Sequence, residues 1–145
     1  MMTRDESILI RHALVWPAWD ADPIPDGSIL ITGERIERVG RFTARAHTVI
    51  DAGGALAMPG FIHAHVHLCQ TLFRGAAEDR PLLRWLRERI WPLEAAHDAF
   101  TLEVSAQLAA AEMIRGGTTG FASIETVRGT EVVLDTIAHI GLTGL

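Results

Sequence analysis

The sequence predicts an α/β fold in which a small all-β segment precedes a parallel β/α series. Three observations predict it. Residues 8–57 hold strand-like runs without a helical period, a Met-Pro-Gly turn follows at residues 58–60, and strands alternate with helices beyond that turn. We therefore expect two domains, one spanning residues 1–57 and the other residues 58–145.

The first domain is expected to consist of short strands joined by turns. Its strand-like runs are rich in branched aliphatic side chains, which favour extended backbone. These runs are residues 8–15, 28–32, 35–39 and 48–50. Residues 17–27 carry three prolines and end in Pro-Asp-Gly, a sequence that predicts a turn.

The second domain is expected to run strand, helix, helix, strand, helix, strand. Residues 61–68 predict a strand, and apolar side chains at helical spacing predict a helix over residues 82–93. Asp98 or Thr101 can cap the next helix, and the glycine pair after Arg115 ends it. The remaining strand, helix and incipient strand are predicted at residues 118–123, 129–140 and 141–145.

Composition excludes several classes of protein. The net charge is −5, and the thirteen Lys and Arg residues are dispersed, which argues against a nucleic-acid-binding surface. The longest apolar stretch, near residues 53–62, is far shorter than the roughly 18 residues of a membrane span. The first residues lack the apolar core of a signal peptide, and Cys69 is the single cysteine. We therefore expect a cytoplasmic protein without a disulfide or a membrane anchor.

Three histidines, His63, His65 and His67, alternate along the predicted strand of residues 61–68. Because side chains two apart on a strand share a face, we expect the imidazoles to form one column. Neighbours in the column would lie about 6.6 Å apart, close enough for two rings to converge on one ion, whereas His63 and His67 would be about 13 Å apart. The expected metal ligands are therefore His65 and His67, and the alternative is a merely polar strand face.

A family resemblance rests on these residues and their surroundings. Pro-Gly-Phe-Ile-His-Ala-His-Val-His at residues 59–67 resembles the first barrel strand of the amidohydrolase superfamily. The sequences of residues 68–75, 83–86 and 90–94 are similar to one branch of that superfamily. This branch holds S-adenosylhomocysteine and 5'-deoxyadenosine deaminases and triazine hydrolases such as atrazine chlorohydrolase. Residues 35–40, 51–54 and 116–119 also resemble family segments.

The resemblance implies a TIM-like (β/α)8 barrel preceded by a small β-sandwich segment. A complete barrel takes about 250 residues, so residues 58–145 would supply about two and a half of its eight units. We therefore expect an N-terminal fragment whose barrel is incomplete and which is inactive by itself.

The resemblance also implies an activity. It implies a metal-dependent amidohydrolase in which metal-activated water deaminates a nucleoside or another N-heteroaromatic ring, with one zinc ion, or alternatively iron, at the site. The remaining ligands and the proton-transfer residues would lie beyond Leu145, which leaves no catalytic residue within this chain. A small heterocyclic substrate and a homo-oligomeric full-length protein are expected. The alternatives are a dechlorinase or cyclic amidase of the same fold, or a catalytically dead truncated product.

Three further residues are predicted to contact substrate. Gln70 and Arg74 follow the histidine strand, and Trp85 offers a flat apolar wall for a heterocycle. The alternatives are that Arg74 only shapes its loop and that Trp85 belongs to the core. Arg84 stands where nucleoside deaminases of the family often have Glu, which weakens the inference of a nucleoside substrate, and Ser123 stands where relatives often have an acid.

The other notable side chains are expected to be structural. We expect that His97 and His139 bind no metal and that Cys69 is a small buried hydrophobe. Trp91 is expected to pack, and Glu94 is expected to serve a turn or a salt bridge.

Overall fold

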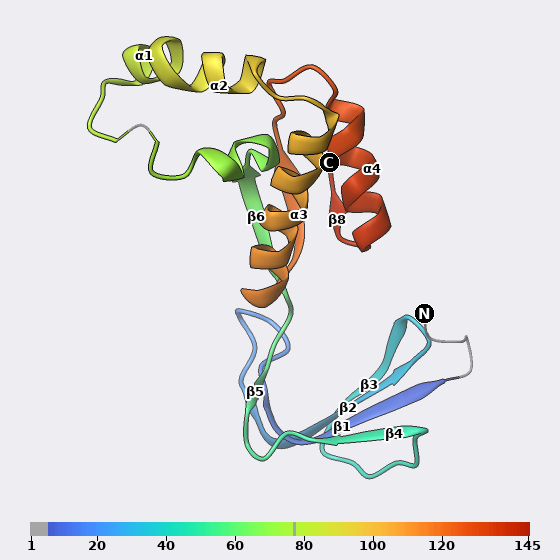
Figure 1. Cartoon of the computed structure of the whole chain (residues 1–145). Helices are drawn as coiled ribbons and strands as arrows, with labels where there is room; N and C mark the ends of the chain where they lie inside the picture. The colour runs from blue at the N-terminus through green and yellow to red at the C-terminus, as the bar shows by residue number, and fades with distance from the viewer. Residues whose placement is uncertain (1–5, 77) are drawn as a thin grey trace. The chain divides into compact units, whose positions relative to one another are not determined.

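A computed structural model describes residues 6–76 and 78–145, and the chain forms two compact units, Met1–Pro59 and Gly60–Leu145 (Figure 1). The boundary lies two residues beyond the one that the sequence predicts. Within the described ranges, no helix has the length and apolar character needed to cross a membrane.

The first unit is a five-stranded sheet built around β1 (Ser7–Val15). On one side β1 pairs antiparallel with β2 (Ile24–Thr32), which pairs in turn with β3 (Arg35–Gly40). On the other side its two halves pair parallel with β4 (Thr48–Asp51) and β5 (Leu56–Ala57). The two-residue β5 is too short for a sequence period and exists through its pairing with β1. The sandwich implied by the resemblance stays a prediction.

The turn predicted at Pro-Asp-Gly is wrong, because these residues lie inside β2. Asp26 has a φ of 53°, and opposite it His12 on β1 has a φ of 55°. The register of the two strands shifts around Ala13, which pairs with Gly27, and His12 Nδ1 lies 2.8 Å from Asp26 Oδ1. The Asp-Gly pair thus forms a β-bulge within continuous strands. Because a positive φ occurs in bulges as well as in turns, the local sequence does not distinguish the two.

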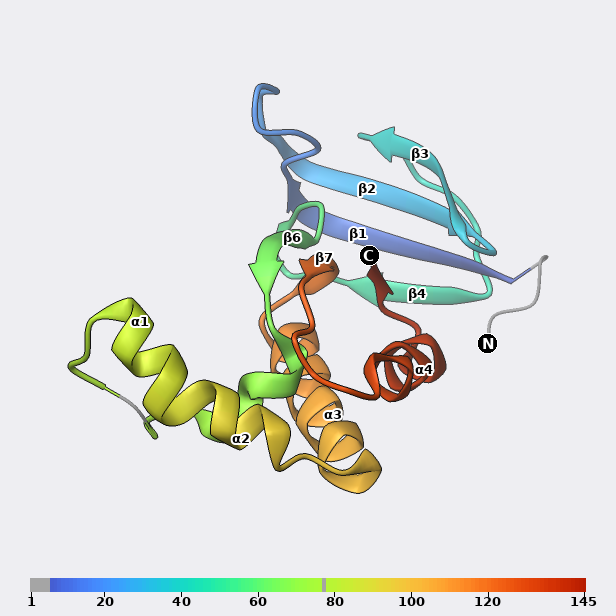
Figure 2. The same ribbon diagram turned by 90° about the horizontal axis from the view of Figure 1, so that it is seen from above.

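The second unit is a three-stranded parallel sheet in the order β6, β7, β8. The strands are β6 (Phe61–Val66), β7 (Thr118–Ser123) and β8 (Thr143–Gly144). The helices α3 (Ala99–Arg115) and α4 (Thr130–Ile140) connect them and lie side by side (Figures 1 and 2). The predicted order of strands and helices, and the parallel sheet that it implies, are confirmed.

The core of this unit lies between α3, α4 and the sheet. The alanines of α3 at 106, 109 and 110 are buried and let its backbone approach its neighbours closely. Larger side chains fill the remaining space. The buried cluster consists of Leu68, Cys69, Leu102, Ala106, Ala109, Ala110, Met113, Phe121, Val133 and Ile137.

The helix predicted at residues 82–93 is continuous but has a wider turn in its middle. It comprises α1 (Leu82–Trp85), a π-helical turn η2 (Leu86–Ile90) and α2 (Trp91–Ala95). Pro92 accounts for the π turn, because its ring would collide with the carbonyl of Glu88 in a regular α-helix.

The helix α3 has defined caps at both ends. Asp98 is its N-cap: Asp98 Oδ1 accepts from the backbone N–H of Thr101, and Thr101 Oγ1 accepts from the N–H of Asp98. This reciprocal pair decides between the two caps that the sequence allowed. At the other end Gly117 adopts a φ of 79°, which reverses the chain toward β7.

Leu102 is expected to be a major contributor to the stability of this unit. Its side chain is 2% exposed in the core, so Leu102→Ala is expected to lower the free energy of unfolding by roughly 2–5 kcal/mol. The matched control on the same helix is Leu108→Ala, which truncates a side chain that is 40% exposed and is expected to cost under about 1 kcal/mol. Urea denaturation measures both values, and equal losses would contradict the placement of the core.

Cys69 is expected to be chemically inert in the folded chain. Burial raises the pKa of its thiol far above the ordinary value, and the Glu125 carboxylate raises that pKa further. Since the thiolate is the reactive form, iodoacetamide at pH 8 is expected to modify Cys69 only after unfolding. Mass spectrometry of native and denatured samples checks this, and rapid labelling of the native protein would contradict it.

Candidate metal centre

His65 and His67 lie at the carboxyl end of β6. His65 belongs to the strand, and His67 is the N-cap of the short 3-10 helix η1 (Leu68–Phe73). Because β6 and β7 are parallel, the segment that leaves β7 after Ser123 lies at the same edge of the sheet. In β/α barrels this edge carries the active site.

The two imidazoles face each other through their outer nitrogens. His65 Nε2 lies 3.1 Å from His67 Nε2, and the rings are nearly perpendicular, with an interplanar angle of 86° and centroids 4.7 Å apart. Two nitrogens bound tetrahedrally at 2.0–2.1 Å from one zinc ion would be about 3.3 Å apart. The donor type and the spacing therefore fit a shared divalent cation.

The proton of His67 is directed away from His65. His67 Nδ1 makes a short hydrogen bond with the carbonyl oxygen of Ile124. A carbonyl only accepts, so Nδ1 carries the proton and the lone pair of Nε2 faces His65. A backbone carbonyl that fixes the tautomer in this way is the usual outer partner of a metal-binding histidine.

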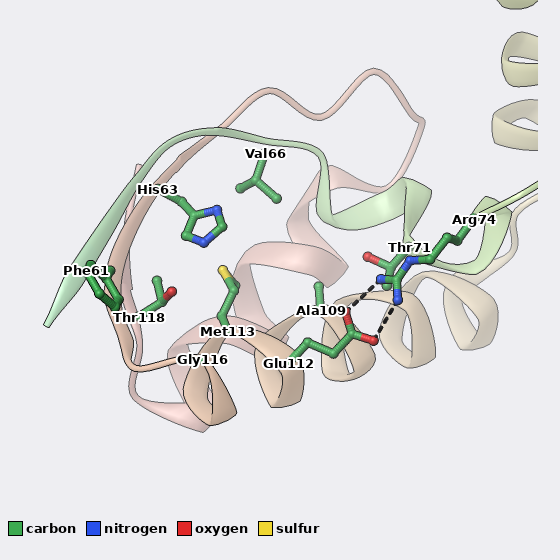
Figure 3. Close-up of a pocket in the computed structure, with 10 residues that line it drawn as sticks. All are labelled: Phe61, His63, Val66, Thr71, Arg74, Ala109, Glu112, Met113, Gly116 and Thr118. Carbon is green, nitrogen blue, oxygen red and sulfur yellow. Dashed lines mark hydrogen bonds and ion pairs between the residues drawn. The ribbon is translucent and has the colours of Figure 1, made fainter. Parts of the chain in front are cut away.

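The expectation that all three histidines form one column is wrong. The pairing of β6 with β7 shifts register between His63 and Val66. Phe61, His63 and Val66 consequently line one pocket of about 400 Å³ beside α3, and neither His65 nor His67 lines that pocket (Figure 3). The bulge breaks the two-residue alternation and turns the His65–His67 pair away from His63.

Glu125 holds the backbone that follows His67. Its Oε1 accepts from the N–H of Leu68 at 2.8 Å, and its Oε2 accepts from the N–H of Cys69 at 2.9 Å. The hydroxyl of Ser123 makes a short contact with the same carboxylate. We did not predict this role from the sequence, although an acidic residue just after a strand at the active-site edge was a usable signal.

Two further side chains anchor η1 from the core. Ser105 of α3 is fully buried and donates to the carbonyl of Leu68 at 2.8 Å. His97 Nε2 lies 2.9 Å from the carbonyl oxygen of Cys69, and its ring stacks on Phe73. His97 Nδ1 lies 3.0 Å from Thr101 Oγ1. Both ring nitrogens of His97 are thus engaged within the protein.

Glu94 differs from its predicted role in a turn or salt bridge. The side chain is only 6% exposed, and its Oε1 accepts from the amide of Gln70 at 2.8 Å and from the hydroxyl of Thr126 at 2.5 Å. These donors are neutral. Glu94 also lines a pocket of about 480 Å³ with Trp91 and Arg128, between α2 and the segment that follows β7. Gln70, predicted to contact substrate, thus lies against a buried carboxylate at the border of a pocket.

Arg74 and Trp85 lie elsewhere in the unit. Arg74 makes a two-pronged ion pair with Glu112 of α3, with N–O distances of 2.9 and 2.7 Å (Figure 3). The Glu112 carboxylate raises the pKa of Arg74, and the guanidinium lowers the pKa of Glu112. This geometry favours the alternative that Arg74 shapes its loop. Trp85 is half-buried on α1, and its predicted contact with substrate stays a prediction.

The histidine pair is not joined by a third ligand in the described part of the chain. No group of three or more His, Cys, Asp or Glu side chains there is arranged to hold a metal ion. His139 Nδ1 contacts the carbonyl of Asp135 on its own helix, as suits a structural residue. Catalytic zinc sites take about three protein ligands, which is one more than the two histidines that converge here.

Comparison with known proteins identifies relatives along the whole chain. A 5'-deoxyadenosine deaminase from Methanococcoides burtonii is 47% identical over 106 residues, which cover 72% of this chain and 24% of that protein. An adenosine deaminase from Xanthomonas campestris, solved with bound zinc, superposes with a TM-score of 0.86 at 31% identity. That superposition covers 98% of this chain and 34% of the solved one.

A solved structure of lower identity shares the fold. Atrazine chlorohydrolase from Arthrobacter aurescens TC1, solved with zinc, has a TM-score of 0.80 at 21% identity, over 94% of this chain and 34% of its own. The chain thus spans about a quarter to a third of the length of these relatives. Residues 56–143, which contain the histidine pair, the Glu125 contacts and the parallel sheet, match the model of the amidohydrolase family. The chain therefore belongs to the amidohydrolase family.

Proposed function

We propose that this chain provides the first β/α units and two metal ligands of a metal-dependent aminohydrolase, which deaminates a nucleoside or a related N-heteroaromatic ring. The observation that carries the proposal is the convergence of His65 Nε2 and His67 Nε2, 3.1 Å apart, at the carboxyl end of β6. The chain spans only part of its relatives, so the activity is proposed for a protein that contains these residues together with the rest of a barrel.

The proposed cofactor is one zinc ion, with iron as the alternative. Support comes from the zinc bound in the Xanthomonas campestris adenosine deaminase and from the all-nitrogen donor pair of this chain. When bound, such an ion supplies the Lewis acidity that lowers the pKa of water toward neutrality. The resident side chains fix the two nitrogens, and the Ile124 carbonyl keeps the proton of His67 on Nδ1.

Deamination is favoured over dechlorination by the similarity to the relatives. The chain is 47% identical to a 5'-deoxyadenosine deaminase but 21% identical to the chlorohydrolase. Arg84, which stands where nucleoside deaminases of the family often have Glu, counts against a nucleoside substrate. Its Nε donates to Glu88 at 2.7 Å on the surface of the helix, with its side chain 67% exposed.

Glu94 is the polar group that we propose to face the substrate pocket, with Gln70 supporting it. The buried carboxylate of Glu94 accepts on Oε1 from the Gln70 amide and the Thr126 hydroxyl, which holds the side chain in place. Its pocket is bordered by the segment that follows β7, and Trp91 supplies an apolar wall. The predicted homo-oligomer of the full-length protein stays a prediction.

The metal assignment is tested by single substitutions within β6 and at its end. His65→Ala and His67→Ala are each expected to abolish stoichiometric zinc binding, because each removes one of the two converging nitrogens. His63→Ala is the matched control, since it removes an imidazole of the same segment that faces the pocket beside α3, and it is expected to retain zinc. Zinc content by inductively coupled plasma mass spectrometry measures all three. Loss of zinc from His63→Ala alone would contradict the assignment.

The substrate class is tested on the protein that carries this chain together with the remaining barrel. Release of ammonia from 5'-deoxyadenosine and adenosine is expected, and release of chloride from atrazine is not. Glu94→Gln is expected to lower kcat/KM for the nucleosides by about 10-fold or more, because it removes a charge that accepts hydrogen bonds. The 145-residue chain alone is expected to show no turnover. Chloride release without ammonia release would overturn the proposal in favour of a dechlorinase.

A further inference from the structure

The segment that leaves β7, residues 123–125, contacts every residue from Val66 to Cys69. The Val66 carbonyl accepts from the N–H of Ile124 at 3.2 Å and lies 3.0 Å from the hydroxyl of Ser123. The next residue, His67, donates through Nδ1 to the Ile124 carbonyl. Leu68 and Cys69 then donate their N–H groups to Glu125. The segment therefore holds the backbone on both sides of His67 as well as its ring.

Glu125 is the side chain on which this arrangement depends. All its hydrogen-bonding partners named above are neutral donors, two of them backbone N–H groups that point the same way at the start of η1. A group with two acceptor oxygens and adequate reach satisfies both donors at once, one on each oxygen. The bond from the Ile124 carbonyl to the ring of His67 comes from the residue directly before Glu125, so the carboxylate also fixes the position of that carbonyl.

We propose that Glu125 is a positioning residue for His67, holding the ring so that Nε2 faces His65 Nε2 and the proton stays on Nδ1. The proposal rests on the metal centre proposed above. In this role Glu125 does not bind the metal ion itself. It holds the backbone of Leu68 and Cys69, which follows His67, and thereby the position of the His67 ring. Loss of such an outer partner typically weakens metal affinity by about 10- to 100-fold.

Two substitutions of Glu125 separate its charge from its geometry. Glu125→Gln keeps the length but replaces one acceptor with a donor, so one backbone N–H loses its partner. Glu125→Asp keeps the charge but is one methylene shorter, so it cannot span both N–H groups. Glu131→Gln is the matched control, because it makes the same change in charge on an exposed residue of α4.

The test measures zinc affinity and the state of His67 in the full protein. Competition with a chelator gives the dissociation constant of Zn²⁺, and both Glu125 variants are expected to bind about 10- to 100-fold more weakly, with the control unchanged.

In the metal-free protein at fixed pH, ¹⁵N NMR of the imidazoles reports the tautomer. The wild type is expected to hold the proton of His67 on Nδ1, and Glu125→Gln is expected to give a mixture of tautomers. Circular dichroism checks that each variant is folded. If Glu125→Gln does not fold, the Zn²⁺ affinity and the His67 tautomer are measured in Glu125→Asp instead.

The outcomes distinguish this inference from the proposed function. Wild-type protein that binds no Zn²⁺ would refute the metal centre itself. Wild-type binding with an unchanged affinity in Glu125→Gln, or full affinity in Glu125→Asp, would refute only the positioning role. An unchanged tautomer of His67 in a folded Glu125→Gln protein would refute it as well.

Discussion

The irregular parallel pairing of β6 with β7 is the constraint on which the histidine site depends. A regular strand would place His63, His65 and His67 on one face. The register shift between His63 and Val66 instead assigns His63 to the side of α3 and leaves His65 and His67 together. The same pairing brings the exit of β7 beside η1, where its backbone and Glu125 reach the residues around His67.

Around this site the chain uses fixed backbone and neutral donors rather than ion pairs. The carbonyl of Leu68 accepts from the buried hydroxyl of Ser105, and the carbonyl of Cys69 lies against His97. Glu94 and Glu125 are both held by neutral donors. The ion pair between Arg74 and Glu112 lies outside this network, on the exposed flank of α3.

The sequence predicted much of the second unit because local signals and long-range packing agree there. The strand predicted at residues 61–68 forms over Phe61–Val66, and Leu68 already belongs to η1. Of the two predicted caps Asp98 is the one used, and the glycines end α3 as predicted. The Asp-Gly pair of β2 shows where local signals fail. A positive φ serves a turn or a bulge equally well, and only the pairing with β1 decided between them.

The sequence by itself determined the fold class and the order of the elements and predicted His65 and His67 as metal ligands, since these follow from periodicity, from motif spacing and from the family resemblance. Tertiary structure decided how the pair is presented. The bulge that separates His63, the burial of Glu94 and the bonds from Glu125 to Leu68 and Cys69 all join residues distant in sequence. No local pattern encodes such contacts, because they form only when parallel strands and the segments between them pack against a shared core.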